Sequence, residues 1–179
     1  MEKYELTILL PCLNEEKNLP NCLKKALKFL TENNIKGEIL LADNGSSDAS
    51  KKIAKSLNVR VIDVKEKGYG NALREGIKKS NGKYIIMADS DDSYDLSNIF
   101  EFYEALKEGY DFVIGNRFKG KLEKGSMPFL NKYVGNPILS YIPKKIFKTP
   151  NYDYHCGLRG GSKQKLINLN LESEGMELA

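Results

Sequence analysis

The sequence contains a single histidine, His155, no tryptophan and only three cysteines in 179 residues. One histidine cannot build the histidine-rich sites that zinc enzymes use. Cys12, Cys22 and Cys156 are odd in number and lack zinc-type spacing, so we expect ordinary reduced thiols. A zinc centre and a disulfide framework are therefore both disfavoured.

The sequence also lacks a long hydrophobic run and a large charge imbalance. No apolar stretch approaches the roughly 20 residues that cross a bilayer, and the first residues show no signal-peptide pattern, so we expect a cytoplasmic protein. The 28 basic and 24 acidic residues leave a net charge of +4, too small to indicate nucleic-acid binding. An anionic ligand and peripheral contact with an anionic membrane both remain open. The length suits one globular domain with a real core.

What the sequence does contain is an alternation of strand-like and helix-like segments. Apolar runs typical of strands occupy residues 4–10, 38–42, 59–64, 84–88 and 110–115. Helix signals mark residues 19–30, 49–57, 68–77 and 97–106, with Asp48 as the predicted N-cap of the second helix. This alternation predicts an α/β fold in which helices cover both faces of a mostly parallel sheet.

Polar loops follow four of the predicted strands, at residues 11–15, 43–46, 89–92 and 116–117. Ligands bind beyond the carboxyl ends of the strands in an open parallel sheet, so these loops should meet on one rim. The third loop carries Asp89, Asp91 and Asp92, whose charges repel one another unless a cation joins them. Taken alone, this cluster is more typical of a solvated acidic turn than of a metal site. Four polar loops on one rim favour a site for metal and phosphate.

Four motifs occur in a specific order: Pro-Cys-Leu-Asn-Glu-Glu at 11–16, Asp-Asn-Gly-Ser-Ser-Asp at 43–48, Asp-Ser-Asp at 89–91 and Gly-Asn-Arg at 115–117. Together they resemble the nucleotide-sugar half of family-2 glycosyltransferases with the Rossmann-related GT-A fold. Later motifs, at 127–128, 135–137 and 153–159, are similar to the branch that loads sugars onto polyprenyl or dolichyl phosphate. The resemblance implies one domain, residues 1–179, with a nucleotide-sugar-binding half (1–118) and an acceptor-side half (119–179).

The resemblance also implies roles for single residues. It places Pro11, Leu13, Glu15 and Asp43 at the base and ribose of a UDP- or GDP-sugar, Asp89 at the nucleotide and cation, Asp91 at a bridging Mg²⁺ or Mn²⁺, Arg117 at the phosphates, and Lys132 and Arg159 at the acceptor or the phosphates. Asp91 and Arg117 are thus the predicted catalytic residues. Magnesium needs only one or two carboxylates beside phosphate oxygens, and a guanidinium forks onto phosphate. A structural role in a helix's first turn for Glu15 and a surface salt bridge for Arg117 are the alternatives.

The implied reaction inverts the anomeric carbon of the donor sugar and supplies cell-envelope glycans or protein glycosylation. A lipid phosphate is already anionic near pH 7, so it needs placement and charge compensation rather than a strong base. The alternative acceptor, a saccharide hydroxyl, would need a carboxylate base, for which Glu174 and Glu177 are the candidates. Lys132 stands where relatives often have arginine, and Ser93 where some have glutamine.

The acceptor-side half bears on the lipid. Lysines and glycines at 119–125 suggest a basic loop that closes over the phosphates. Apolar residues interleaved with lysines at 132–148 suggest a segment lying on an anionic leaflet, and a core-packing helix is an equal alternative. Relatives continue beyond the segment that resembles residues 174–179, so we expect a C-terminal truncation. A non-catalytic sugar-nucleotide-binding subunit and a membrane-embedded partner subunit therefore stay open.

Overall fold

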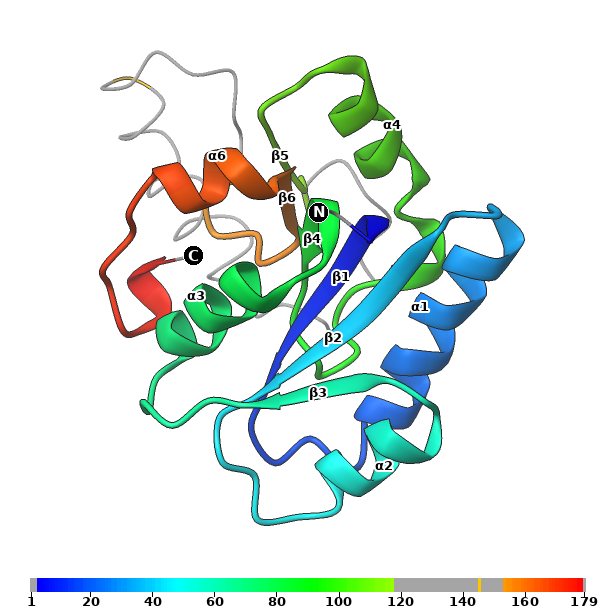
Figure 1. The fold of residues 1–179 in the computed structure, drawn as a ribbon, viewed down its shortest axis with the longest axis vertical. Helices are drawn as coiled ribbons and strands as arrows, with labels where there is room; N and C mark the ends of the chain where they lie inside the picture. Colours follow the sequence, from blue (N-terminus) through cyan, green and yellow to red (C-terminus); the bar gives the residue numbers. More distant parts are fainter. Residues whose placement is uncertain (1–2, 118–144, 146–152, 179) are drawn as a thin grey trace.

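A six-stranded sheet organises the residues that the computed structural model describes, which are 3–117, 145 and 153–178 (Figure 1). Its strands are β1 (Tyr4–Cys12), β2 (Gly37–Asp43), β3 (Arg60–Asp63), β4 (Gly82–Met87), β5 (Phe112–Ile114) and β6 (Arg159–Ser162), in the order β3-β2-β1-β4-β6-β5. β1 pairs in parallel with β2 and β4, and β2 with β3, whereas β6 runs antiparallel to β4 and β5. The predicted mostly parallel α/β sheet is confirmed.

Helices cover both faces of this sheet, as expected. They are α1 (Leu19–Glu32), α2 (Ser50–Ser56), α3 (Tyr69–Lys79), α4 (Phe100–Glu108) and α6 (Lys163–Asn168), with short 3-10 turns η1 (Leu96–Asn98) and η3 (Met176–Leu178). Alternate residues of β1 divide the core: Ile8 and Leu10 pack with α1, while Leu9 packs with α3. In Figure 1, α1 and α2 lie on one side of the sheet and α3 and α6 on the other.

The first strand runs two residues further than its apolar pattern predicts. β1 includes Pro11 and Cys12, although proline cannot donate a ladder hydrogen bond. The reason is position: the β1–β4 pairing ends at Leu9, so Pro11 has only β2 as a ladder neighbour. Past that point the Ser90 hydroxyl donates to the Pro11 carbonyl at 2.8 Å and joins the two strand ends.

Other predicted boundaries shift as well. The N-cap of α2 is Ala49 rather than Asp48, although the Asp48 carboxylate still accepts from the Ser50 N–H at 2.9 Å. The predicted helix at 97–106 divides into η1 and α4, because the Asp95 side chain accepts from the Ser97 N–H and caps a separate turn. The third and fifth predicted strands are both shorter than expected: they are β3 and β5.

The sequence pattern misses β6, whose residues Arg-Gly-Gly-Ser lack any apolar alternation. β6 lies between β4 and β5 because two glycines allow close packing: a Cβ at Gly160 would lie 3.0 Å from the Val113 side chain and 3.2 Å from the Ile85 carbonyl oxygen. Its first residue, Arg159, pairs with Met87 at the end of β4 and so lies on the rim where the predicted loops meet.

Part of the predicted acceptor-side half lies outside the described residues. Lys132, the basic loop at 119–125 and most of the segment at 132–148 lie outside the described residues; Lys145 is described and exposed. Within the described ranges, no helix combines the length and apolar character that a bilayer crossing requires.

Candidate functional site

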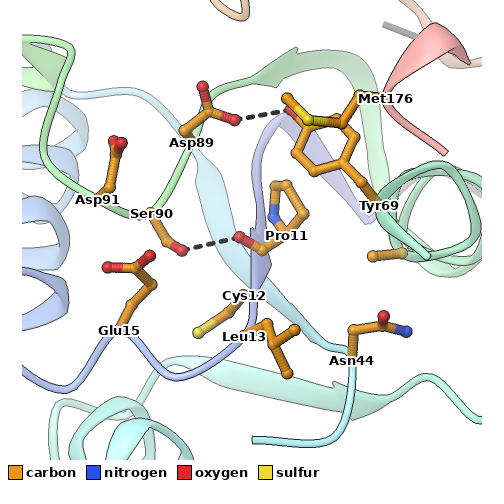
Figure 2. Close-up of a pocket in the computed structure, with 11 residues that line it drawn as sticks. Pro11, Cys12, Leu13, Glu15, Asn44, Tyr69, Asp89, Ser90, Asp91 and Met176 are labelled. Carbon is orange, nitrogen blue, oxygen red and sulfur yellow. Dashed lines mark hydrogen bonds between the residues drawn. The ribbon is translucent and has the colours of Figure 1, made fainter. Parts of the chain in front are cut away.

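A pocket of about 320 Å³ opens where β1, β2 and β4 end (Figure 2). Five predicted residues line it, namely Pro11, Leu13, Glu15, Asp89 and Asp91. Six residues without a predicted site role also line it, namely Cys12, Asn44, Tyr69, Ala72, Ser90 and Met176. The rim therefore brings together loops that are far apart in the sequence, as the strand-end rule predicts.

The loop after β1 is locked to the loop after β2. The Asn14 N–H donates to the Ser46 hydroxyl at 2.9 Å, and the Asn14 side-chain oxygen accepts from the Ser47 N–H at 2.8 Å. The Glu15 N–H donates to the Ser50 hydroxyl at 2.9 Å. Asn14 has a φ of 59°, a left-handed conformation that asparagine tolerates. These bonds fix the backbone that presents Leu13 and Glu15 to the pocket. Glu15 lies ahead of α1, which begins at Leu19.

Asp43 lies beneath this pocket wall instead of lining it. Its side chain is fully buried, and Oδ2 accepts from the Gly45 N–H at 3.0 Å and the Ser46 N–H at 3.1 Å. The neighbouring Asn44 faces the pocket, and its side-chain oxygen accepts from the Gly68 N–H at 2.8 Å. The geometry thus gives Asp43 the task of shaping a turn. Asn44 lies in the same predicted loop, so its position next to Asp43 could have predicted that it lines the pocket.

The three carboxylates of the acidic loop have different surroundings. Asp92 points toward α1: Lys25 Nζ lies 2.9 Å from Asp92 Oδ1, and the Asn21 side chain donates to Oδ2. Asp91 is exposed at the pocket and accepts from the Ser93 N–H at 3.0 Å. Asp92 therefore anchors the loop, and Asp89 and Asp91 are the two carboxylates of this loop that line the pocket.

Asp89 is the more buried of these two. Its Oδ1 accepts a hydrogen bond from the Tyr69 hydroxyl at 2.7 Å, drawn in Figure 2. Burial raises the pKa of Asp89; the charge of Asp91 raises it further, while the Tyr69 hydrogen bond and the charges of Arg159 and Arg117 oppose the rise. An ionised Asp89 beside Asp91 would be stabilised by a divalent cation.

The two pocket carboxylates fit a magnesium or manganese ion to which the protein supplies few ligands. Among the described residues, no three histidine, cysteine or carboxylate side chains converge as a metal cluster. Two pocket carboxylates are enough for Mg²⁺, which retains several waters and takes phosphate oxygens as further ligands. The pair Asp89 and Asp91 therefore fits a metal that arrives with a diphosphate, and does not form a closed protein cage.

Arg117 is held in a partly buried ion pair. Its Nε and Nη2 donate to the two carboxylate oxygens of Asp153 at 2.7 and 2.8 Å, and its backbone N–H donates to Oδ2 at 3.1 Å. Burial alone would raise the pKa of Asp153, but the hydrogen bonds and charge of Arg117 outweigh it and lower that pKa. Hydrogen bonding to Asp153 in turn raises the pKa of Arg117. Arg117 therefore does form a salt bridge, which was the alternative role predicted for it. Its partner, Asp153, is fully buried, so this is not the surface salt bridge that was expected.

Arg159 also lies at this rim, with its guanidinium fixed by backbone. Its Nε donates to the Cys156 carbonyl at 2.7 Å and its Nη2 to the Tyr154 carbonyl at 2.8 Å. Burial lowers the pKa of Arg159, yet a guanidinium stays charged at neutral pH. Its charge acts on both Asp89 and Tyr69, so Arg159 belongs to the electrostatic environment of the acidic loop.

Glu174 and Glu177, the two candidates for a catalytic base, both accept hydrogen bonds from nearby backbone N–H groups. The Glu174 carbonyl accepts from the Gly70 N–H at 2.8 Å, and Glu177 Oε1 accepts from the Gly175 N–H at 3.1 Å. Met176, between them, is the residue of this segment that lines the pocket, and it is 75% exposed.

The comparisons with known proteins agree with this arrangement. The sequence matches the family model described as Glycosyl transferase family 2 over residues 7–169. The chain belongs to glycosyltransferase family 2. This family-2 chain is 33% identical over 175 residues to the low-salt glycan biosynthesis hexosyltransferase Agl6 of Haloferax volcanii, covering 97% of this chain and 42% of that protein. It is 34% identical over 134 residues to the dolichyl-phosphate beta-glucosyltransferase of Dictyostelium discoideum, covering 65% of this chain and 41% of that protein.

The fold of this family-2 chain is similar to solved structures. Glucosyl-3-phosphoglycerate synthase of Mycobacterium tuberculosis, in complex with Mn²⁺, UDP-glucose and phosphoglyceric acid, superposes with a TM-score of 0.66 at 20% identity, covering 90% of this chain and 57% of that one. This similarity confirms the predicted GT-A-like fold. The family-2 chain spans less than half the length of the two relatives named above.

Proposed function

We propose that this protein is an inverting, metal-dependent glycosyltransferase that moves a sugar from a UDP- or GDP-sugar to a polyprenyl or dolichyl phosphate. The observation behind the proposal is the pocket at the strand ends, which Asp89 and Asp91 line and where the charges of Arg117 and Arg159 act on Asp89. Family membership supports the reaction class, and the name of the Dictyostelium relative supports the lipid phosphate.

The donor half of the site divides into a nucleoside part and a diphosphate part. Pro11, Leu13, Glu15 and Asn44 would surround the nucleoside, since they line the pocket on the locked loops after β1 and β2. For Asp43 we propose support of that wall rather than ligand contact. Asp89 and Asp91 would hold Mg²⁺ or Mn²⁺. When bound, the cation supplies charge compensation for the leaving diphosphate.

The basic residues would act on the phosphates. Arg117 and Arg159 are fixed by Asp153 and by two backbone carbonyls, so their charges are already oriented before a ligand arrives. An anionic lipid phosphate needs no strong base, and neither Glu174 nor Glu177 lines the described pocket. Attack by that phosphate on the face opposite the leaving group inverts the anomeric carbon. Lys132 remains a proposed acceptor contact on sequence grounds.

Metal-linked donor binding tests the site. Calorimetric titration of UDP-glucose and of GDP-mannose, with and without Mn²⁺, should show that the metal strongly tightens the binding of one of the two donors. Asp91→Asn should weaken this metal-dependent affinity by at least about tenfold, because it removes one of two carboxylate ligands. Asp92→Asn is the matched control: the same charge is lost one residue away, from a side chain that faces Lys25. Equal metal-linked affinity in wild type and Asp91→Asn would refute the assignment.

Turnover tests the acceptor. The protein is incubated with the labelled donor, Mn²⁺ and a polyprenyl phosphate, and lipid-linked sugar is measured. Label in the lipid fraction with inverted anomeric configuration supports the proposal. Donor binding without a lipid-linked product favours a sugar-nucleotide-binding subunit, and transfer to a saccharide hydroxyl in a parallel reaction favours that acceptor.

A further inference from the structure

Tyr69 is the pocket residue whose role the proposed function leaves open. It is the first residue of α3, and its ring forms part of the pocket wall, with Met176 drawn beside it in Figure 2. Its hydroxyl donates to Asp89 Oδ1 at 2.7 Å. A tyrosine hydroxyl keeps its proton at neutral pH, so Tyr69 is the donor and the Asp89 carboxylate the acceptor in this bond.

The start of α3 is held from outside the pocket by the chain segment that precedes η3. The Glu174 carbonyl accepts from the Gly70 N–H at 2.8 Å and the Asn71 N–H at 3.3 Å, and Arg74 Nη1 donates to the Glu172 carbonyl at 2.9 Å. The approach requires glycine, because a Cβ at Gly70 would lie 2.5 Å from the Ser173 carbonyl oxygen. The segment therefore fixes the backbone from which the Tyr69 side chain projects.

Asp89 is restricted on its other side as well. A Cβ at Gly157 would lie 2.7 Å from Asp89 Oδ2, so the carboxylate packs directly against the backbone of the 153–157 loop. With Oδ1 bonded to Tyr69 and Oδ2 on the Gly157 side, the carboxylate plane has little freedom to rotate. Among the described residues, the side-chain hydrogen bond that orients this carboxylate comes from Tyr69.

We infer that Tyr69 is a positioning residue of the donor site: its hydroxyl fixes the orientation in which Asp89 receives the metal-bound nucleotide. The segment at 172–174, which belongs to the acceptor-side half, acts on the donor site through Tyr69. This inference rests on the proposed function. Groups that orient a metal ligand contribute about 10–100-fold to metal affinity, which sets the size of the expected effect.

Tyr69→Phe tests the inference, because it removes the hydroxyl and keeps the ring in the pocket wall. Tyr103→Phe is the matched control: Tyr103 also donates to a carboxylate, Glu5 Oε2 at 3.0 Å, but it does not line the pocket. Binding of Mn²⁺ is measured by electron paramagnetic resonance of the free ion, in one series with UDP and in another with GDP. Binding of each nucleotide without metal is measured by calorimetry.

The expected result is a loss of about tenfold or more in nucleotide-dependent Mn²⁺ affinity for Tyr69→Phe, and no change for Tyr103→Phe. Metal-free nucleotide affinity should stay at the wild-type value in both variants, since the ring remains. Equal Mn²⁺ affinity in the two variants would overturn the role of Tyr69 and leave the proposed function standing. Absence of Mn²⁺ binding by the wild-type protein with either nucleotide would overturn the proposed metal dependence and the role of Tyr69 together.

Discussion

The pair of Arg117 and Asp153 offers the most quantitative test of how the rim is assembled. Asp153→Asn keeps the shape of the side chain and removes its charge. The asparagine amide has only one oxygen, so it can accept only one of the two guanidinium bonds, which measure 2.7 and 2.8 Å. At the other position the amide NH₂ faces a guanidinium N–H, and two donors meet. The Arg117 charge then remains on the rim without its buried counterion.

The expected cost follows from burial. Removing one partner of a fully buried ion pair costs about 3–5 kcal/mol. Asp153 is fully buried, but the Arg117 side chain is 23% exposed, so water can solvate part of the orphaned charge. We therefore expect a loss of about 2–3 kcal/mol in the free energy of unfolding. For a chain of this size, that loss lowers the melting temperature by about 5–10 °C.

Thermal and urea unfolding at several pH values provide the assay. The folded-state pKa of Asp153 lies below its unfolded value of about 3.9, so the contribution of the pair is complete above that pH and is lost as the pH falls toward the folded-state pKa. The deficit of Asp153→Asn should therefore be constant near pH 7 and shrink below about pH 4.

Asp111→Asn is the control for this experiment. Asp111 pairs with Lys165 on the surface, where both side chains are more than half exposed, so its loss should cost no more than about 1 kcal/mol. If Asp153→Asn unfolds with the same midpoint as Asp111→Asn, the ion pair does not stabilise the rim and the reasoning fails.

Two further predictions concern glycines at close contacts. Gly157→Ala should weaken metal-dependent donor binding by at least about tenfold in calorimetry, because the new Cβ would meet Asp89 Oδ2 at 2.7 Å; unchanged binding would show that the carboxylate can move freely. Gly70→Ala should release the segment around Glu174 from α3, because its Cβ would lie 2.8 Å from that carbonyl carbon. Hydrogen exchange of residues 171–178 should then accelerate, and wild-type protection in the variant would contradict the contact.

The central part of the fold could be predicted because its elements carry their own periodicity. The apolar runs in β1, β2 and β4 and the leucine spacing of α1 follow directly from burial. β6 could not be predicted in the same way. Glycine is a poor strand former, so β6 carries no strand pattern in the sequence. Glycine fits there because a larger side chain would be crowded by Val113 and Ile85, and only the folded structure shows this contact.

The candidate site divides in a similar manner. Asp89 and Asp91 could be placed because they directly follow a buried strand, and strand ends share one rim. Tyr69 and Asp153 could not, because their partners are 20 and 36 residues away in the sequence and only the packing of α3 and the 153–157 loop brings them together. Asp43 was predicted from its position after β2, but the bonds from its carboxylate to its own turn could not be predicted from that position.

β6 also decides where the polypeptide can be cut. Among the described strands, it alone bridges β4 and β5, so a strand from the second half of the chain closes the sheet of the first half. A fragment that ended before residue 153 would lack β6, so β4 would have an unpaired edge and β5 would lose its pairing partner. Unpaired strand edges promote aggregation. The two fragments should instead reassociate by strand addition, as in complementation of split enzymes. Residues 3–117 and 153–178 therefore share one sheet, and we expect them to unfold as one cooperative unit that cannot be exchanged between homologues as separate modules.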